Sequence, residues 1–257
     1  MKLLKLLILS LLMIFIVVIS GCTNKTDIST SNSPIRSANV EIVSKSLTYP
    51  AYLAESTQSG KMPAIVLIHS FNGLEPGYKN LTDNLAKEGY IVLSPQWQTF
   101  NRTPSDEIVE GIISDSVAYL KTKPNVDGNR LGLTGFCAGG RYTMLFLPQM
   151  DTFRSGVAWY GFPYSGGFAN QSKPIDFIEQ LNVPMLMIHG THDVPSPIED
   201  IYRYATALNA SGKYFELKVY QGEPHGLMIE NGQLSQSFEA RDAYREMVDF
   251  FNRTLTG

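Results

Sequence analysis

Three side chains with complementary chemistry occur in this sequence in an order that suits nucleophilic catalysis. Cys137 lies in GFCAGG, Asp193 in GTHDVPSP and His225 in QGEPHG. A histidine can take the proton of a thiol and later donate one to a leaving group, while a carboxylate orients the imidazole and stabilises its charged form. We therefore expect Cys137 to attack a carbonyl carbon, with His225 and Asp193 assisting.

The residues around Cys137 predict a sharp turn between a strand and a helix. The segment LGLTG, residues 131–135, is typical of a buried strand, and a helical pattern follows the cysteine. Gly135, Gly139 and Gly140 suit such a turn because its strained backbone leaves no room for Cβ atoms nearby. The positive end of the following helix favours the thiolate over the thiol.

Asp193 and His225 each follow a predicted strand. MLMIHG at 185–190 precedes Asp193, and FELKVY at 215–220 precedes His225. Open α/β sheets bind ligands beyond the carboxyl ends of their strands, so we expect both side chains and Cys137 at one edge of the sheet. The chain order nucleophile, acid, histidine is that of α/β-hydrolases.

A tetrahedral intermediate at Cys137 needs hydrogen-bond donors for its oxyanion. In this kind of site they are the backbone N–H after the nucleophile and another N–H in the loop after an earlier strand. Ala138 supplies the first donor. Phe71, in HSFNGLEPG, is the candidate for the second, and the alternative interpretation of that segment is a simple glycine turn.

Short apolar runs alternate with helical patterns along most of the chain. This alternation predicts an α/β-hydrolase fold, with a mostly parallel sheet, right-handed crossovers and helices on both faces. Residues 40–56 are expected to add antiparallel leading strands. The predicted strands are residues 64–69, 91–95, 131–135, 156–161, 185–190 and 215–220, and the predicted helices are residues 78–88, 106–122, 139–149, 198–211 and 237–253.

Further residues at this predicted sheet edge are candidates for substrate binding. Aromatic side chains gather in its loops and strand ends, and they include Trp97 and Tyr160. Small-molecule sites are usually lined by apolar groups with a few placed polar ones. Ser70 lies in the predicted oxyanion loop. Arg102 is either a residue at the mouth of the site or a solvated loop arginine.

The N-terminus has the pattern of an export signal. Lys2 and Lys5 precede an apolar run at residues 6–19, which is shorter than the roughly 20 residues that span a bilayer. The following ISGC resembles the lipobox of prokaryotic lipoproteins. We therefore expect residues 1–21 to be a signal peptide and Cys22 to carry lipid; the alternative is an uncleaved anchor.

The predicted signal peptide sets the compartment and the domain boundaries. Either form of the N-terminus tethers the protein to a membrane, facing outside the cytoplasm. Residues 22–39 are rich in Ser, Thr and Asn and predict a flexible tether. Residues 40–257 are expected to form one domain with a single core.

Composition argues against several classes of function. The net charge of −3, with both signs mixed, provides no basic stripe for nucleic acid. His69, His189 and His192 lie near the predicted site, and we expect each to be structural. No HExxH or CxxC pattern occurs, so the sequence predicts no metal site.

With Cys137, Asp193 and His225 in these contexts, the chain resembles the dienelactone hydrolase family of the α/β-hydrolases from about Val40 to Phe251. GFCAGG, GTHDVPSP and QGEPHG carry the resemblance, and HSFNG and WYG add to it. The resemblance implies a hydrolase without a cofactor that cleaves small esters or lactones through a thioester intermediate.

The chain departs from this family at two positions. Members commonly carry a glutamate in the oxyanion loop that pairs with the resting cysteine, and Ser70 occupies that position here. Family enzymes also hold a substrate carboxylate with arginines, one of them shortly after the catalytic histidine, where this chain has Ile229. The resemblance therefore implies the reaction type more directly than the dienelactone substrate.

Two other functions fit parts of the pattern. A peptidase with the same fold stays open, because substrate choice resides in loops rather than in the catalytic residues. An anchored, non-catalytic scaffold would use the fold to bind a ligand or a partner protein. The matched nucleophile, acid and base favour the hydrolase, since a binding protein needs none of them.

Overall fold

The computed structural model describes residues 33–169 and 171–256. The predicted signal peptide and Cys22 lie outside these described residues. Within them, no helix is long and apolar enough to cross a membrane.

One eight-stranded sheet organises the described part of the chain, in the order β1-β2-β4-β3-β5-β6-β7-β8. The pairs β1/β2 and β2/β4 are antiparallel, and every later pair is parallel. The strands are β1 (Ile35–Ser44), β2 (Leu47–Ser56), β3 (Met62–Ile68), β4 (Ile91–Pro95), β5 (Val126–Phe136), β6 (Ser155–Trp159), β7 (Met185–His192) and β8 (Phe215–Pro224).

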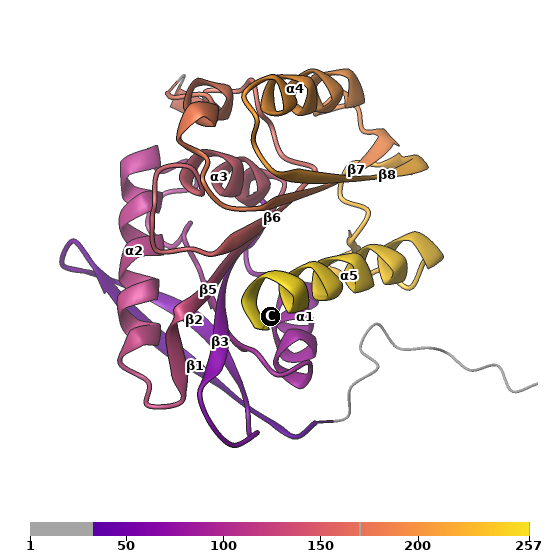
Figure 1. Ribbon diagram of the computed structural model, residues 1–257. Helices are drawn as coiled ribbons and strands as arrows, with labels where there is room; N and C mark the ends of the chain where they lie inside the picture. The colour runs from indigo at the N-terminus through magenta and orange to yellow at the C-terminus, as the bar shows by residue number, and fades with distance from the viewer. Residues whose placement is uncertain (1–32, 170, 257) are drawn as a thin grey trace, which may run out of the picture.

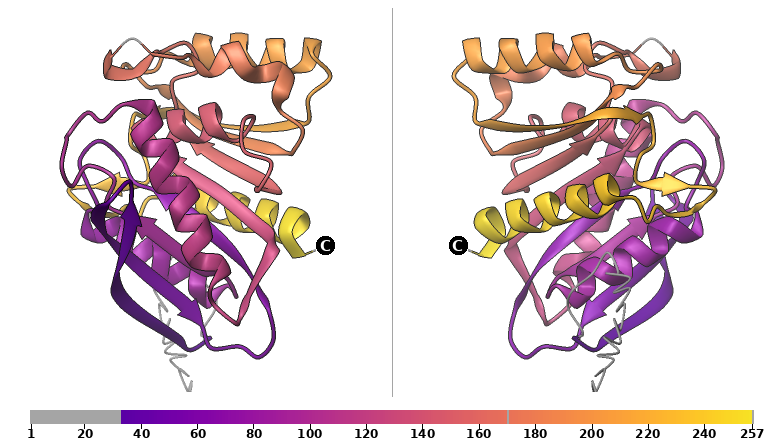
Figure 2. Two further views of the ribbon diagram at one scale, coloured as in Figure 1. Left: turned by 90° about the vertical axis from the view of Figure 1, so that its left-hand side faces the viewer. Right: turned by 90° about the vertical axis from the view of Figure 1, so that its right-hand side faces the viewer.

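Helices cover both faces of the sheet (Figures 1 and 2). One face packs against α1 (Pro76–Lys87) and α5 (Phe238–Phe251), and the other against α2 (Asp106–Lys121), α3 (Ala138–Phe146) and α4 (Ile198–Ala210).

The central strands supply apolar side chains to both layers. Ile65 and Leu67 of β3 join the core under α1 and α5, while Ala64, Val66 and Ile68 join the core under the other helices. A strand buried on both faces reads as a continuous apolar run because successive side chains point to opposite faces. This burial explains why the sequence pattern located these strands well.

Local signals fix the helix ends. Pro76 is the first residue of α1, where its missing N–H leaves no donor unpaired. Asp106 and Glu107 lie in the first turn of α2, at the positive end of the helix. The Ser237 hydroxyl accepts a hydrogen bond from the Ala240 N–H and so caps α5.

Short elements that the sequence pattern did not predict lie between the longer ones or after the last helix. After His225 the chain forms a small hairpin from β9 and β10. These elements are β9 (Ile229–Glu230), β10 (Gln233–Leu234), the 3₁₀ turns at Gly167–Ala169 and Pro174–Gln180, and the π-helical turn at Asn252–Thr256.

The start of the folded domain differs from the prediction. The tether was expected to extend to Asn39, but Ile35 pairs with Ser56 and Asn39 pairs with Tyr52 in the β1/β2 ladder. A strand at the edge of the sheet can be largely polar, because its backbone hydrogen bonds hold it and only part of it faces the core. Residues 35–39 therefore belong to the domain.

Candidate functional site

Cys137 occupies a strained turn between β5 and α3. Its backbone has φ 57° and ψ −113°, a region that residues with side chains seldom adopt. The Cys137 N–H donates to the carbonyl of Trp159 at 3.1 Å, which ties the turn to the end of β6. The thiol is free and half-buried. The turn thus holds a single nucleophilic side chain beyond the carboxyl edge of the sheet.

Two glycines make this turn possible through close backbone contacts. A Cβ on Gly135 would lie 2.1 Å from the carbonyl oxygen of Gly139, and a Cβ on Gly139 would lie 2.1 Å from the carbonyl oxygen of Ile68. Both distances are far below van der Waals contact, and rigid backbone cannot move away. The predicted need for small residues beside Cys137 is therefore confirmed.

Asp193 is buried and held in one orientation from three sides. The Ser196 N–H donates to its Oδ1 at 2.8 Å, and His225 Nδ1 lies 2.8 Å from its Oδ2. His189 Nε2 lies 3.3 Å from the same Oδ2 and donates to the Ser196 carbonyl at 2.8 Å. These contacts leave the carboxylate facing the His225 ring.

His225 is hydrogen-bonded to Asp193 through its Nδ1 and also interacts with Cys137. Its Nε2 is buried and forms no hydrogen bond in the described structure. Burial lowers the pKa of His225, but its hydrogen bond to Asp193 and its interaction with Cys137 outweigh burial and raise this pKa to about 9. The ring is therefore an imidazolium at neutral pH, which suits a thiolate at Cys137.

The remaining histidines have structural surroundings. Burial lowers the pKa of His69 to about 4, and its ring stacks on Trp97 with a centroid distance of 5.3 Å. His69 Nδ1 lies 2.7 Å from the carbonyl oxygen of Ser70. Burial also lowers the pKa of His189, and His192 is exposed. No group of His, Cys, Asp and Glu that could hold a metal ion occurs among the described residues.

Both predicted oxyanion donors lie beside Cys137. Ala138 is the first residue of α3, where backbone N–H groups have no partner within the helix. Phe71 lies in the loop after β3, and no described residue accepts a hydrogen bond from its backbone N–H. Two free N–H groups near the thiol are what a tetrahedral oxyanion requires.

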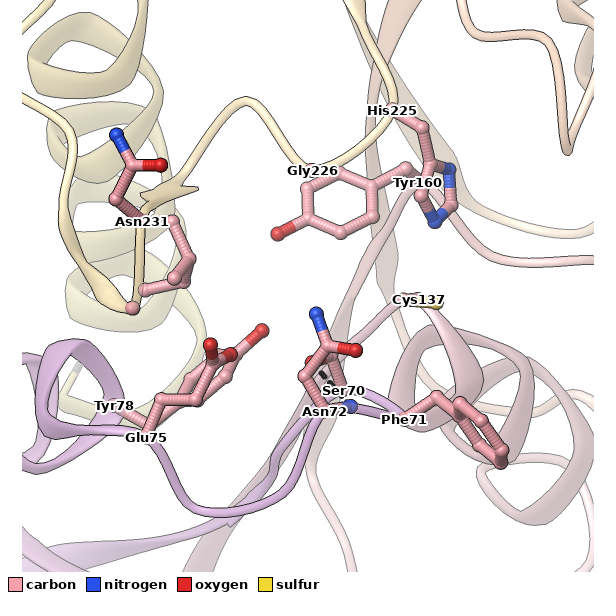
Figure 3. Close-up of a pocket in the computed structure, with 12 residues that line it drawn as sticks. Ser70, Phe71, Asn72, Glu75, Tyr78, Cys137, Tyr160, His225, Gly226 and Asn231 are labelled. Atoms are coloured by element: carbon pink, nitrogen blue, oxygen red, sulfur yellow. Dashed lines mark hydrogen bonds between the residues drawn. The ribbon is translucent and has the colours of Figure 1, made fainter.

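Two cavities meet at Cys137, and Phe71, Asn72 and His225 line both of them. The first, here called the polar cavity, has a volume of about 260 Å³, and Figure 3 shows its lining. The second, here called the apolar cavity, has a volume of about 390 Å³. Only the polar cavity is lined by Ser70, Glu75, Tyr78, Tyr160, Gly226, Ile229, Asn231 and Gly232, and only the apolar cavity by Ala138, Arg141, Tyr142, Phe162, Ser165, Gly167, Phe168 and Pro195.

The substrate-binding candidates have different locations. Ser70 and Tyr160 line the polar cavity, and their role in substrate binding stays a prediction. The prediction for Trp97 is wrong, because its ring is 1% exposed and its Nε1 donates to the carbonyl of His69 inside the core. Arg102 is exposed and lines neither cavity, but its guanidinium lies 4.5 Å from the centre of the Phe71 ring.

Several residues of the site were not predicted. Glu75 and Tyr78 enter the polar cavity from the start of α1, and a carboxylate directly before a helix-starting proline was the sequence signal available for Glu75. Arg141 stabilises one wall of the apolar cavity through hydrogen bonds. Its guanidinium binds both oxygens of Asp106 at 2.8 Å and donates to the carbonyls of Ser165 and Ser172.

Comparison with known proteins identifies the family. The model of the family described as "Dienelactone hydrolase family" matches residues 49–107 and 97–255. The chain belongs to the dienelactone hydrolase family. The sequence-based prediction of this family is therefore confirmed.

Curated relatives of this dienelactone hydrolase family member align along most of both chains. A Methylorubrum extorquens protein named "Putative carboxymethylenebutenolidase" is 28% identical and covers 93% of this chain and 88% of its own length. An Escherichia coli protein of the same name is 27% identical, and the alignment covers 89% of this chain and 91% of the E. coli protein.

Solved structures confirm the α/β-hydrolase fold. The "Putative Dienelactone Hydrolase" of Klebsiella pneumoniae superposes with a TM-score of 0.78 at 23% identity, over 86% of this chain and 99% of that one. The acylaminoacyl peptidase of Pyrococcus horikoshii superposes with a TM-score of 0.73 at 20% identity, over 86% of this chain and 42% of that one. At these identities the likeness concerns the fold.

Proposed function

We propose that this dienelactone hydrolase family member cleaves small esters or lactones at Cys137 through a thioester acyl-enzyme. The observation that carries the proposal is the line of three groups, in which a buried Asp193 carboxylate orients His225 toward a thiol on a strained turn. Membership of a hydrolase family supports it. The raised pKa of His225 also supports it, because an imidazolium stabilises the attacking thiolate.

The first half of the reaction forms the thioester. The Cys137 thiolate attacks the carbonyl carbon, a C–S bond forms, and the carbonyl oxygen becomes an oxyanion that accepts hydrogen bonds from the Phe71 and Ala138 N–H groups. The C–O bond to the leaving group then breaks. His225 donates its Nε2 proton to the departing alkoxide, and the acyl group stays on Cys137.

The second half of the reaction releases the acid. Neutral His225 takes a proton from water while the water oxygen attacks the thioester carbon. Collapse of this second intermediate breaks the C–S bond and returns Cys137 as a thiolate beside the His225 imidazolium. In a lactone both halves belong to one molecule, so the product is a hydroxy acid.

In this proposal, His225 replaces the family glutamate as the partner of the resting thiol. The Ser70 hydroxyl carries no charge, and it accepts a hydrogen bond from the Asn72 N–H at 3.2 Å. Ser70 therefore cannot take up the thiol proton as a carboxylate would. The imidazolium of His225 fills the charged position beside the resting Cys137.

Trapping the acyl group tests the proposed mechanism. Mixing the protein with p-nitrophenyl butyrate and quenching within milliseconds is expected to give one butyryl adduct by intact mass, located on the peptide that contains Cys137. Pretreatment with iodoacetamide is the control, and it should prevent both the adduct and turnover. Turnover with the adduct on another residue would exclude Cys137 as the nucleophile.

We also propose that the protein is exported and anchored to a membrane by lipid on Cys22. The apolar segment, the ISGC sequence and the polar residues that follow support this proposal. Replacing Cys22 with serine is expected to move the protein from the detergent phase to the aqueous phase in Triton X-114 partitioning of expressing cells. An unchanged distribution, with the N-terminal segment still removed, would contradict the anchor.

A further inference from the structure

The two cavities that meet at Cys137 differ in chemistry. The apolar cavity is lined by aromatic and aliphatic groups such as Phe162, Phe168 and Pro195. The polar cavity presents the Glu75 carboxylate and the hydroxyls of Tyr78 and Tyr160. An ester at Cys137 has two halves that must extend away from the carbonyl carbon. The two cavities provide one space for each half.

The polar groups of the polar cavity have unused hydrogen-bonding capacity. The Tyr160 side chain is 1% exposed, and its hydroxyl interacts with the neighbouring Tyr78 side chain but makes no hydrogen bond of standard geometry in the described structure. Figure 3 shows this hydroxyl and that of Tyr78 directed into the cavity. Within the part of the chain that the structure describes, the Glu75 carboxylate has neither a hydrogen bond nor an ion pair, and partial burial raises its pKa. Unpaired groups in such a position are ready for a polar ligand.

The charges around the two cavities disfavour a substrate carboxylate. No lysine or arginine lines the polar cavity, where Glu75 supplies a negative charge. Arg141 lines the apolar cavity, but Asp106 neutralises its charge, and its Nε and Nη2 also donate to the backbone carbonyls of Ser165 and Ser172. Arg102 lies outside both linings. A carboxylate in the polar cavity would therefore meet the negative charge of Glu75, while the imidazolium of His225 is already engaged by Asp193 and Cys137.

The chemistry of the two linings assigns the two halves. The apolar cavity suits an alkyl acyl chain, because aromatic and aliphatic groups line it. The polar cavity suits a hydroxyl-bearing alcohol half, and His225, which contacts Tyr160 of the polar cavity and Phe162 of the apolar cavity, can donate its proton to a leaving oxygen there. The alcohol half therefore occupies the polar cavity.

We propose that the polar cavity binds an uncharged, hydroxyl-bearing alcohol half, so that the substrates are apolar acyl esters of glycerol or a similar small polyol and not esters that carry a carboxylate. This assignment rests on the proposed hydrolase function. Glu75 accepts hydrogen bonds from the polyol, and Tyr160 donates to it. The same two groups take the place of the arginines with which family enzymes hold a substrate carboxylate, one of which corresponds to Ile229 here.

Two esters with the same acyl group and different alcohol halves test the assignment. Initial rates are measured by pH-stat on glycerol 1-butyrate and on (butyryloxy)acetate, which differ only in the alcohol half. The wild-type protein is expected to prefer the glycerol ester by about tenfold in kcat/KM, because like charges in a partly buried site repel. The ratio of the two kcat/KM values, measured on one preparation, does not depend on the fraction of active protein.

Two variants with matched controls locate the cause. Glu75→Gln is expected to reduce the preference by about tenfold, chiefly by admitting the charged ester. Glu41→Gln removes the same charge from exposed β1 and should keep the wild-type ratio. Tyr160→Phe is expected to lower kcat/KM for the glycerol ester several-fold relative to propyl butyrate. Tyr204→Phe, which removes another buried hydroxyl without a hydrogen-bond partner, should leave that ratio unchanged.

The outcomes separate this assignment from the proposed function. Failure of p-nitrophenyl butyrate to acylate Cys137 would overturn the hydrolase mechanism and the assignment together. Acylation at Cys137 with equal rates on the glycerol and carboxylate esters would overturn only the assignment. A wild-type preference that Glu75→Gln and Tyr160→Phe both leave intact would likewise overturn the role of the polar cavity.

Discussion

Replacing Cys137 with alanine is expected to lower kcat/KM for p-nitrophenyl butyrate by about 10⁴-fold or more while the protein stays folded. In the proposed mechanism this sulfur forms the covalent bond to the substrate. A catalytic unit loses most of its rate when any one of its members is removed. Alanine has the same Cβ as cysteine, so it meets the same strain at φ 57° and adds none. Activity and thermal unfolding by circular dichroism are measured on both proteins.

The interpretation of the Cys137→Ala result depends on whether the variant stays folded. A Tm within a few degrees of wild type would show that the loss concerns chemistry, because the deleted sulfur is half-buried and makes no disulfide. Wild-type ester hydrolysis by Cys137→Ala would exclude the thioester mechanism. It would favour a non-catalytic scaffold at this site, with hydrolysis occurring elsewhere.

Replacing Asp193 with asparagine is expected to lower kcat/KM by about 10³- to 10⁴-fold, the scale seen when a triad carboxylate becomes an amide. Burial alone lowers the pKa of His225, and Asp193 opposes it. Loss of the carboxylate therefore moves this pKa down from about 9, so less imidazolium is present at pH 7. Cys137 then loses its charged neighbour, and His225 loses the carboxylate that fixes its tautomer.

Alkylation by iodoacetamide measures this change apart from substrate turnover. The pH at which Cys137 reacts at half its maximal rate is expected to be higher in Asp193→Asn than in wild type, because only the thiolate reacts quickly. Asp200→Asn, which removes a charge from the first turn of α4, is the control and should keep the wild-type profile. Identical profiles in all three proteins would show that Asp193 does not set the state of the His225–Cys137 pair.

The sequence predicted the fold and the proximity of Cys137, Asp193 and His225 because these depend on local signals. Cys137 and Asp193 follow strands with buried apolar runs, His225 follows the partly buried edge strand β8, and parallel strands place their carboxyl ends at one edge. The polar cavity depends on distant contacts instead. The Gly77 N–H donates to the Gly232 carbonyl at 2.9 Å, so α1 docks on the hairpin after His225. Neither segment alone indicates that contact.

Trp97 illustrates a second limit of sequence patterns. An aromatic residue after a strand can turn toward a ligand or into the core, and composition does not distinguish these directions. Here His69 decides the direction, because its carbonyl accepts the Trp97 Nε1 proton and its ring stacks on the indole. The early part of β1 poses a similar problem, since its pairing with β2 is visible only once both strands are placed.

The way Arg141 is fastened has a consequence for how the acyl chain is chosen. One buried guanidinium joins α3 to Asp106 at the start of α2 and to the carbonyls of Ser165 and Ser172. Ser165 and Phe168 line the apolar cavity together with Arg141. A lining held by a buried ion pair and backbone hydrogen bonds loses little conformational freedom when an acyl chain enters, so we expect it to select acyl chains by length rather than to adapt to each one.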